Sequence, residues 1–403
     1  MENSWTEKTF KGGVNIKISL KSVYTGLMLV LLYHGVFVRF PYLYIQRIIA
    51  LILFTLILPK IRFRKKDIPI FVLLGVYTVF TIISAFVNKD NYVYTHTIVG
   101  GLFHILIIFE IFQVLVYAIK VRSADFVIKI FLFLSLVYVI CNDFLVLFYP
   151  EIFRHNYLLG NKFMVSYKHI ELIVLYCMGK RKNIFAFLVI VAISLYISAK
   201  VNCMTGAVGI GILTVLIFLK AGKLLQKRLL FFGIVGVSAA FPFVYDFFTD
   251  IYPIRYFIVN ILNRTTGMTG RTVIFDYLPL ILRNHLILGY GYNAAYEVWI
   301  SATDWYPNAQ NAFWNCVCEQ GIICAVLLTV TAVYSIGIRK NIKFCYPLMC
   351  VVYVYEILGA VEITMDITFI AWVIFLYALK SGEKNDKRDN TRLQRGKIHF
   401  RVH

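Results

Sequence analysis

Charged residues are scarce in this sequence: they make up 15% of its 403 positions, whereas soluble domains carry about a quarter. This shortage argues against an ordinary soluble enzyme or binding domain. The eight cysteines all fall in or beside apolar stretches, so we interpret them as packing residues rather than as a disulfide or zinc framework. No internal repeat or low-complexity linker is visible, and the first apolar stretch lacks the features of a cleavable signal peptide.

Apolar residues dominate the chain instead, at 60% of positions with a mean hydropathy of +0.74. They come in blocks of about 20 residues, the length that a helix needs to cross a bilayer. Such continuous runs exclude the alternating pattern of barrel strands. The blocks lie near 20–38, 42–59, 68–87, 98–119, 126–148, 164–178, 184–199, 203–219, 229–248, 312–337, 345–360 and 364–379. The sequence therefore predicts an all-α polytopic integral membrane protein with about twelve transmembrane helices.

Lysine and arginine predict the orientation of these helices. Of the 41 basic residues, 30 fall in every second connection, counted from the N-terminal segment. Because positive residues mark the cytoplasmic side, we expect both the N- and the C-terminus in the cytoplasm. The net charge of +20 then follows mostly from topology. Nucleic acid is not an expected partner, because its binding needs a soluble basic domain and none is visible.

One connection differs from the others in length. We expect a single membrane domain over 1–380, followed by a disordered basic cytoplasmic tail over 381–403. The long connection, about 249–311, runs outside the membrane between predicted helices 9 and 10, and it is too apolar for disorder. Its residues 272–288 carry apolar side chains at helical spacing around Pro279, which predicts a short amphipathic helix.

The external side carries basic residues that the orientation rule does not explain. Those of the long loop and of the connection before predicted helix 6 are Arg255, Arg264, Arg271, Arg283, Arg154 and Lys162. A planar guanidinium makes two-pronged contacts to phosphate oxygens, and several together neutralise a diphosphate. We therefore expect this group to bind an anion. The alternative is that single arginines pair with acidic residues of the same loop or face water.

Two segments of the external side carry a recognisable pattern. The first is "TGRTVIFDYLPLILRNHLILGYG" at 269–291, followed by "NAQNAFWNCVCEQGI", and the second is "RHNYLLGNKFMVSYKH" at 154–169. Their order resembles the bacterial O-antigen polymerase and O-antigen ligase superfamily, and the second segment is similar to a helix entry in capsular and exopolysaccharide repeat-unit polymerases. The positions that match the first pattern are Arg271, Gly289, Gly291, Gln310, Asn311, Glu319 and Gly321.

The resemblance implies a definite reaction. Members of this superfamily act at the outer face of the bacterial cytoplasmic membrane, on oligosaccharides linked to undecaprenyl diphosphate. Its polymerases are glycosyltransferase-type enzymes that transfer the growing chain from this lipid donor to the next lipid-linked repeat unit, with no cofactor and no metal. The implied partners are the donor, the acceptor and the lipid bilayer, together with a chain-length regulator and a flippase of the same pathway. The product would be O-antigen, capsule or exopolysaccharide.

The sequence departs from the ligases at one position. Where they carry a histidine that is thought to activate the acceptor, this chain has Gln310, which holds a hydroxyl but takes no proton. The departure favours a polymerase and leaves the base open among Asp276, Glu319 and His285, although His285 is also explained as a helix-terminal residue. With the six basic residues, Gln310 and Asn311 complete the expected substrate-binding set.

Two other functions remain open at this stage. An O-antigen ligase-type transferase is the nearer alternative, and a lipid-linked oligosaccharide flippase is the more distant one. Flippases usually show repeated halves with a long loop in the middle of the chain, and this chain shows neither feature. Glu356, Glu362 and Asp366 lie toward the external ends of the last two predicted helices and are candidates to line the same cavity. His104 and Glu110 are interpreted as a packed polar contact.

Overall fold

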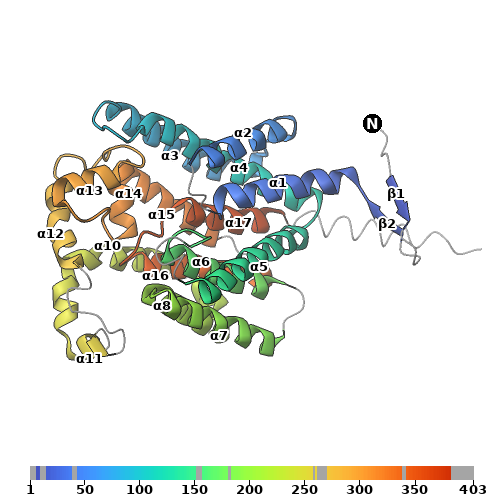
Figure 1. Cartoon of the computed structure of the whole chain (residues 1–403). Helices are drawn as coiled ribbons and strands as arrows, with labels where there is room; N and C mark the ends of the chain where they lie inside the picture. Colours follow the sequence, from blue (N-terminus) through green and yellow to red (C-terminus); the bar gives the residue numbers. More distant parts are fainter. Residues whose placement is uncertain are drawn as a thin grey trace, which may run out of the picture.

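The computed structural model describes residues 6–9, 15–38, 43–150, 157–179, 183–256, 259–260, 270–337 and 342–382 (Figure 1). About four-fifths of these residues are helical, which confirms the predicted all-α class with one exception. Near the N-terminus, β1 (Thr6–Thr9) and β2 (Asn15–Ile18) form an antiparallel pair. The predicted tail beyond residue 382 and the site candidates Arg154 and Arg264 lie outside the described residues.

The helices follow the apolar blocks closely. They are α1 (Leu20–Val36), α2 (Leu43–Ile57), α3 (Ile68–Val87), α4 (Thr97–Val121), α5 (Ala124–Phe148), α6 (Lys162–Met178), α7 (Ile184–Lys200), α8 (Met204–Leu219), α9 (Gly222–Leu225), α10 (Arg228–Asp250), α11 (Tyr252–Tyr256), α12 (Arg271–Leu282), α13 (Ala295–Thr303), α14 (Ala312–Gln320), α15 (Ile322–Gly337), α16 (Ile342–Leu358) and α17 (Ile367–Gly382), with single 3₁₀ turns at Leu58–Lys60 and Lys65–Asp67. Each block overlaps a helix because an apolar run of this length buries its backbone polar groups only as a helix.

Four described segments are long and apolar enough to cross a membrane: Lys65–Val87, α4, α5 and Arg228–Tyr245. Six shorter apolar helices accompany them, in α1, α7, α8, α15, α16 and α17. Large apolar side chains also point outward from peripheral helices, among them Leu51, Phe133, Ile140, Leu188 and Tyr196. An exterior of this kind is typical of a membrane protein. The prediction of twelve spans stays a prediction.

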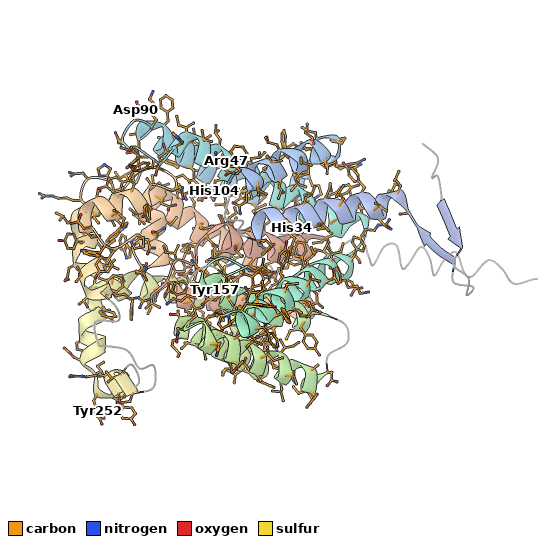
Figure 2. The ribbon with its side chains drawn as sticks, in the orientation of Figure 1. His34, Arg47, Asp90, His104, Tyr157 and Tyr252 are labelled. Atoms are coloured by element: carbon orange, nitrogen blue, oxygen red, sulfur yellow. The ribbon has the colours of Figure 1, made fainter. Side chains whose placement is uncertain are left out.

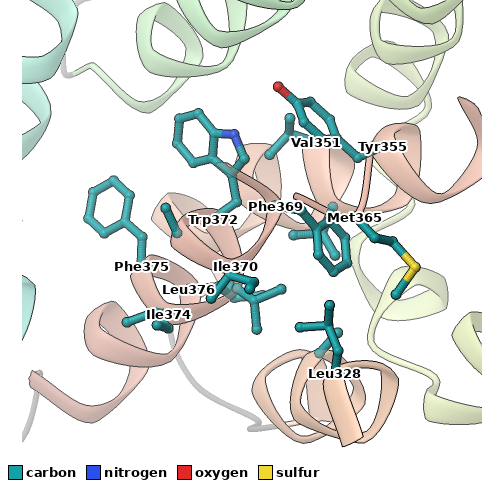
Figure 3. Close-up of a cluster of buried hydrophobic side chains, with 14 of the residues drawn as sticks. Leu328, Val351, Tyr355, Met365, Phe369, Ile370, Trp372, Ile374, Phe375 and Leu376 are labelled. Atoms are coloured by element: carbon teal, nitrogen blue, oxygen red, sulfur yellow. The ribbon is translucent and has the colours of Figure 1, made fainter. Parts of the chain in front are cut away.

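The centre of the bundle is formed by α16 and α17. Helix α17 packs against α4, α15 and α16, so it is enclosed on several sides. Its Phe369 and Trp372 are fully buried and lie close to Tyr355 of α16 and to Leu328 of α15 (Figure 3). A helix that is apolar all round belongs in such a position, since no face of it favours water.

The predicted helix over 312–337 is wrong in one respect, because it is two helices. Gly321 separates α14 from α15 at a φ of 85°, which is a left-handed conformation that side chains disfavour. The turn that follows α12 lies against this break. The amide of Ile322 donates to the Leu286 carbonyl at 2.8 Å, and the amide of Tyr290 donates to the Cys318 carbonyl at 2.7 Å. The interruption is therefore a docking point for the long connection between α10 and α14, which we call the external connection after its predicted side of the membrane.

The described part of the external connection contains several short helices. It contains α11, α12 and α13, and α12 confirms the predicted amphipathic helix, with Ile274, Phe275, Leu278, Ile281 and Leu282 buried. The helix ends at Leu282 rather than at residue 288, because the chain turns there to reach the break beside Gly321. Because the chain turns here, the start of α12 and the residues around 289 pack against different helices of the bundle.

Candidate functional site

Arg271 is the first residue of α12, directly after Gly270, whose φ is 90°. Its guanidinium reaches the connection between α16 and α17. There Nη2 donates to Glu362 Oε1 at 2.7 Å and to the Val361 carbonyl at 2.9 Å, while Nε donates to the same carbonyl at 3.2 Å. The side chains are 12% and 6% exposed for Arg271 and Glu362, so this is a largely buried ion pair.

Two further residues approach the same carboxylate. The Thr205 hydroxyl, in the first turn of α8, donates to Glu362 Oε1 at 3.2 Å. Lys162, the first residue of α6, acts on Glu362 through its positive charge. Three helices of 17, 16 and 12 residues thus begin at or beside this carboxylate: α6, α8 and α12. Since a helix N-terminus carries partial positive charge, the place favours a negative group.

The charge state of Glu362 is set by opposing effects. Burial raises the pKa of its carboxyl to about 7, whereas the Arg271 guanidinium, the Thr205 hydroxyl and the Lys162 ammonium favour the ionised form. Burial therefore outweighs the three favourable neighbours. A carboxyl with a pKa near 7 exchanges its proton readily at neutral pH, which is the property required of a general base. We refer to Arg271, Glu362, Thr205 and Lys162 as the external polar cluster, after the side of the membrane that the sequence predicts for them.

A second group of polar residues lies inside the bundle beside the external polar cluster. Lys168 Nζ is 2.9 Å from Glu171 Oε2 within α6, and both side chains are almost fully buried. The ammonium also donates to the Phe37 carbonyl and lies 4.8 Å from the ring centroid of Tyr33. A small cavity of about 20 Å³ adjoins the pair and is lined in part by Asp366. This volume is room for about one water molecule.

The next residue of α6 takes part in another buried contact. His169 Nε2 is 3.2 Å from Asp143 Oδ1 of α5, and its Nδ1 is 3.0 Å from Ser194 Oγ of α7. The Ser194 hydroxyl donates to the Ile190 carbonyl at 2.7 Å, so it accepts from the histidine. Although the residue types match a hydrolase triad, Ser194 is fully buried and its proton is already engaged. The contact serves to join three helices.

Gln310 and Asn311 occupy different environments although they are adjacent. Asn311 is fully buried, its Oδ1 accepts from the Trp314 amide at 3.1 Å, and its Nδ2 donates to the carbonyls of Ser238 and Ala360. It caps α14 and ties that helix to its neighbours. Gln310 is half-buried at a φ of 48°, and its side-chain amide donates only to Asn308 among the described contacts. Of the two, Gln310 is the one with a side chain placed to meet a substrate.

The other predicted site residues are dispersed. Asp276 lies five residues after Arg271, about 140° around the helix, and is exposed on the outward face of α12. Glu319 is half-buried near the end of α14, where the Asn315 side chain donates to it at 3.4 Å and the Ser84 hydroxyl of α3 donates to its backbone carbonyl. Arg255 is exposed in α11. The structure thus joins Arg271 and Lys162 and leaves these three apart from them.

Arg283 and His285 lie together at the far end of α12. Both line an open depression of about 610 Å³, along with Asn91 and Asn284. The His285 ring stacks on Tyr290 at 3.8 Å between centroids, and burial lowers the pKa of this histidine. Its position after the end of α12 agrees with the helix-terminal interpretation. The alternative that single loop arginines pair with acidic residues of the same loop does not describe the ion pair of Arg271, which is with Glu362.

The buried histidine of α4 also has a local role. His104 lies inside the bundle, whereas Asp90 and Tyr252 project from its surface (Figure 2). The Tyr77 hydroxyl is 2.8 Å from His104 Nε2, and the ring of Tyr292 stacks on the histidine at 4.3 Å. Tyr292 follows the glycine turn of the external connection, so this contact fixes that turn against α4. Within the described residues, no three His, Cys, Asp or Glu side chains are grouped to hold a metal ion.

From the sequence, Glu362 was a candidate to line the cavity but was not among the predicted catalytic or substrate-binding residues. Thr205 had no distinguishing pattern and was not predicted. The signal that pointed to Glu362 was an ionisable residue beside long apolar runs, where a charge needs a partner. Its partner is 91 positions away in the chain, and no local pattern reveals such a contact.

The fold and its exterior define this chain as an all-helical protein with the features of a membrane protein. No protein-family model matches the chain, and no curated protein matches it. The function is therefore argued from the site itself.

Proposed function

We propose that this protein is a polysaccharide repeat-unit polymerase that joins undecaprenyl-diphosphate-linked oligosaccharides at the outer face of the bacterial cytoplasmic membrane. In this proposal it crosses the membrane about twelve times with both termini in the cytoplasm. The observation that supports it best is the external polar cluster, in which Arg271 and Thr205 contact Glu362 and the charge of Lys162 acts on the same carboxylate.

The cluster suits a diphosphate for electrostatic reasons. A diphosphate carries several negative oxygens, and helix N-termini together with arginine and lysine are the groups that proteins use to bind them. The external polar cluster contains two cationic side chains and only one carboxylate, so it has positive charge left over. Most of it is shielded from water by burial, which strengthens each electrostatic interaction.

The same groups fit the chemistry of the transfer. When the sugar leaves undecaprenyl diphosphate, negative charge grows on the departing phosphate oxygen and must be stabilised. Arg271 and Lys162 supply that stabilisation in the proposal. Gln310 is assigned to orient the acceptor hydroxyl, because its amide both donates and accepts hydrogen bonds. No nucleotide sugar and no metal enter this reaction.

The partners follow from the reaction. The lipid donor and acceptor would reach the external polar cluster from the outer leaflet, and a flippase must first bring them to that side. A chain-length regulator is the further expected partner. The polymer could become O-antigen, capsule or exopolysaccharide, and the site chemistry is the same for each.

Replacement of Arg271 tests the proposal. In the native bacterium, Arg271→Ala should abolish polymer while the protein remains in the membrane, and single lipid-linked repeat units should accumulate. Arg271→Lys should restore only part of the activity, because lysine lacks the planar fork. The matched control is Lys89→Ala, which removes an exposed cation at the end of α3.

Each result has a clear meaning. Polymer of normal length and amount from the Arg271→Ala strain would remove this residue from the mechanism. Normal polymer accompanied by loss of its attachment to a second acceptor would instead indicate a ligase.

A further inference from the structure

Glu362 has two properties that anion binding alone does not require. Its Oε1 accepts hydrogen bonds from both Arg271 and Thr205, and it occupies the position at the meeting of three helix starts where an anionic ligand would be favoured. The Glu362 carboxylate thus occupies the position that a phosphate oxygen of the ligand would take. A diphosphate that binds Arg271 must therefore replace this contact.

Resting on the proposed polymerase function, we infer that Glu362 is the proton acceptor for the attacking sugar hydroxyl. Arg271 stays paired with Glu362 until the donor diphosphate binds the guanidinium and breaks this ion pair. The exchange couples binding to catalysis. Before the donor binds, the positive charge of Arg271 neutralises the Glu362 carboxylate. Once the donor binds, the carboxylate is released from Arg271 and lies close to the reacting bond.

The exchange also makes Glu362 a stronger base. Burial already raises the pKa of its carboxyl to about 7, and the nearby Arg271 works against that rise. Removing the guanidinium therefore raises the pKa further, so the carboxylate takes up a proton more readily. The other titratable groups that face it are Lys162, Cys203 and Tyr167, and Tyr167 in turn faces Asp366.

The reaction balances without another reagent. The acceptor hydroxyl oxygen bonds to the anomeric carbon of the donor, and the bond from that carbon to the diphosphate oxygen breaks. Its electron pair leaves on the undecaprenyl diphosphate, and the hydroxyl proton passes to Glu362. When the diphosphate departs, Arg271 pairs with Glu362 again, which lowers the pKa of the carboxyl and returns the proton to water.

A purely structural role for Glu362 gives a different expectation. Glutamine keeps an oxygen that accepts from Arg271 and Thr205, so Glu362→Gln preserves both hydrogen bonds while removing the charge and the basicity. If the carboxylate only positions Arg271, the variant should polymerise normally. The matched control is Asp90→Asn, which removes an external carboxylate that is 84% exposed.

The first measurement is binding of undecaprenyl diphosphate to the purified full-length protein in detergent micelles, from pH 6 to 8.5. Because the ionised carboxylate competes for Arg271, wild-type binding should weaken above pH 7 by up to about tenfold per pH unit. Glu362→Gln should bind more tightly at pH 8 and show little pH dependence. Undecaprenyl diphosphate is the leaving group, so its complex corresponds to the product state, in which Glu362 carries the proton taken from the hydroxyl. Titration in buffers of different ionisation enthalpy should therefore show proton uptake by the wild type near pH 7 and none by the variant.

The second measurement is polymer formed per membrane-inserted molecule. Glu362→Gln should lose at least about a hundredfold, in line with removal of a general base, and Asp90→Asn should match the wild type. Glu362→Asp serves as the second variant, because it retains a carboxylate and should keep part of the activity and the pH dependence. Retained thermal stability of the purified variants excludes misfolding as the cause.

Failure of the inference and failure of the proposed function give different results. Tighter binding with normal polymer in Glu362→Gln would overturn the role as base while leaving the polymerase intact. Unchanged, pH-independent binding in both proteins would overturn the exchange with Arg271. Normal polymer from Arg271→Ala would instead overturn the proposed function.

Discussion

Gly321 and Ile287 approach each other so closely that no side chain fits between them. A Cβ atom on Gly321 would lie 1.9 Å from the Ile287 carbonyl oxygen, which is far inside contact distance. This contact joins the break between α14 and α15 to the turn after α12. Helix α12 is thus held at its start by the pair of Arg271 with Glu362 and after its end by the turn that packs on Gly321.

Gly321→Ala should therefore destabilise the protein strongly. The left-handed backbone and the collision with Ile287 together should cost about 3 kcal/mol or more. Gly233→Ala in α10 is the matched control, because the space around it is empty, and alanine there should be neutral or slightly stabilising. Thermal unfolding of the detergent-purified proteins measures both effects. Equal melting temperatures for the two variants would contradict the proposed docking of the turn.

Breaking the buried ion pair of α6 should be costly. Lys168→Met leaves Glu171 buried without its cation, which typically costs about 3–5 kcal/mol. The double variant Lys168→Met with Glu171→Leu should recover most of that loss, because no unpaired charge remains. Lys129→Met is the control, since Lys129 is 70% exposed and its pair with Asp125 is worth less than about 1 kcal/mol. Unfolding temperatures that fall additively in the double variant would show that the two side chains do not stabilise each other.

Replacing Gln310 or Asn311, the adjacent side-chain amides at the start of α14, by alanine should have different effects. Asn311→Ala removes a helix cap and leaves two buried carbonyls, those of Ser238 and Ala360, without their donor, at a cost of about 2–3 kcal/mol. The amount of protein in the membrane should fall accordingly. Gln310→Ala should leave that amount nearly unchanged and reduce polymer per molecule, in keeping with an acceptor-binding role. Unchanged specific activity in Gln310→Ala would assign this residue to the turn alone.

The proposed topology predicts which positions a membrane-impermeant thiol reagent reaches. Seven of the native cysteines are buried and Cys141 is exposed, so the Cys141→Ser variant has no exposed native cysteine for the reagent to label. In intact cells, cysteine at Ala302 in α13 should be labelled, whereas cysteine at Lys223 in α9 should be labelled only after the membrane is opened. Both positions are exposed in the fold, so access depends only on the side of the membrane. Labelling of the second site in intact cells would reverse or break the predicted arrangement.

Apolar length by itself determined where the helices of this protein lie. A run of about 20 apolar residues has few alternatives to a helix, because each backbone group must find a partner within the segment. The same reasoning located α12 from the spacing of Ile274, Phe275, Leu278 and Ile281. Charge bias drew attention to Arg271 only as one of several cations on the predicted external side, and the resemblance to the polymerase and ligase pattern singled it out among them.

Tertiary structure alone decided what Arg271 contacts. Its partner Glu362 is 91 positions away, and the two meet because α12 turns back at Leu282 and docks against the break at Gly321. The break was missed because the block over 312–337 was interpreted as one continuous helix, although Glu319 and Gln320 directly precede Gly321 and a more apolar run follows it. Asp276 and Arg271 are close in sequence but lie about 140° apart around α12, so their closeness along the chain wrongly suggested that they belong to one site. Local patterns fix local structure, whereas a buried ion pair depends on how distant helices pack.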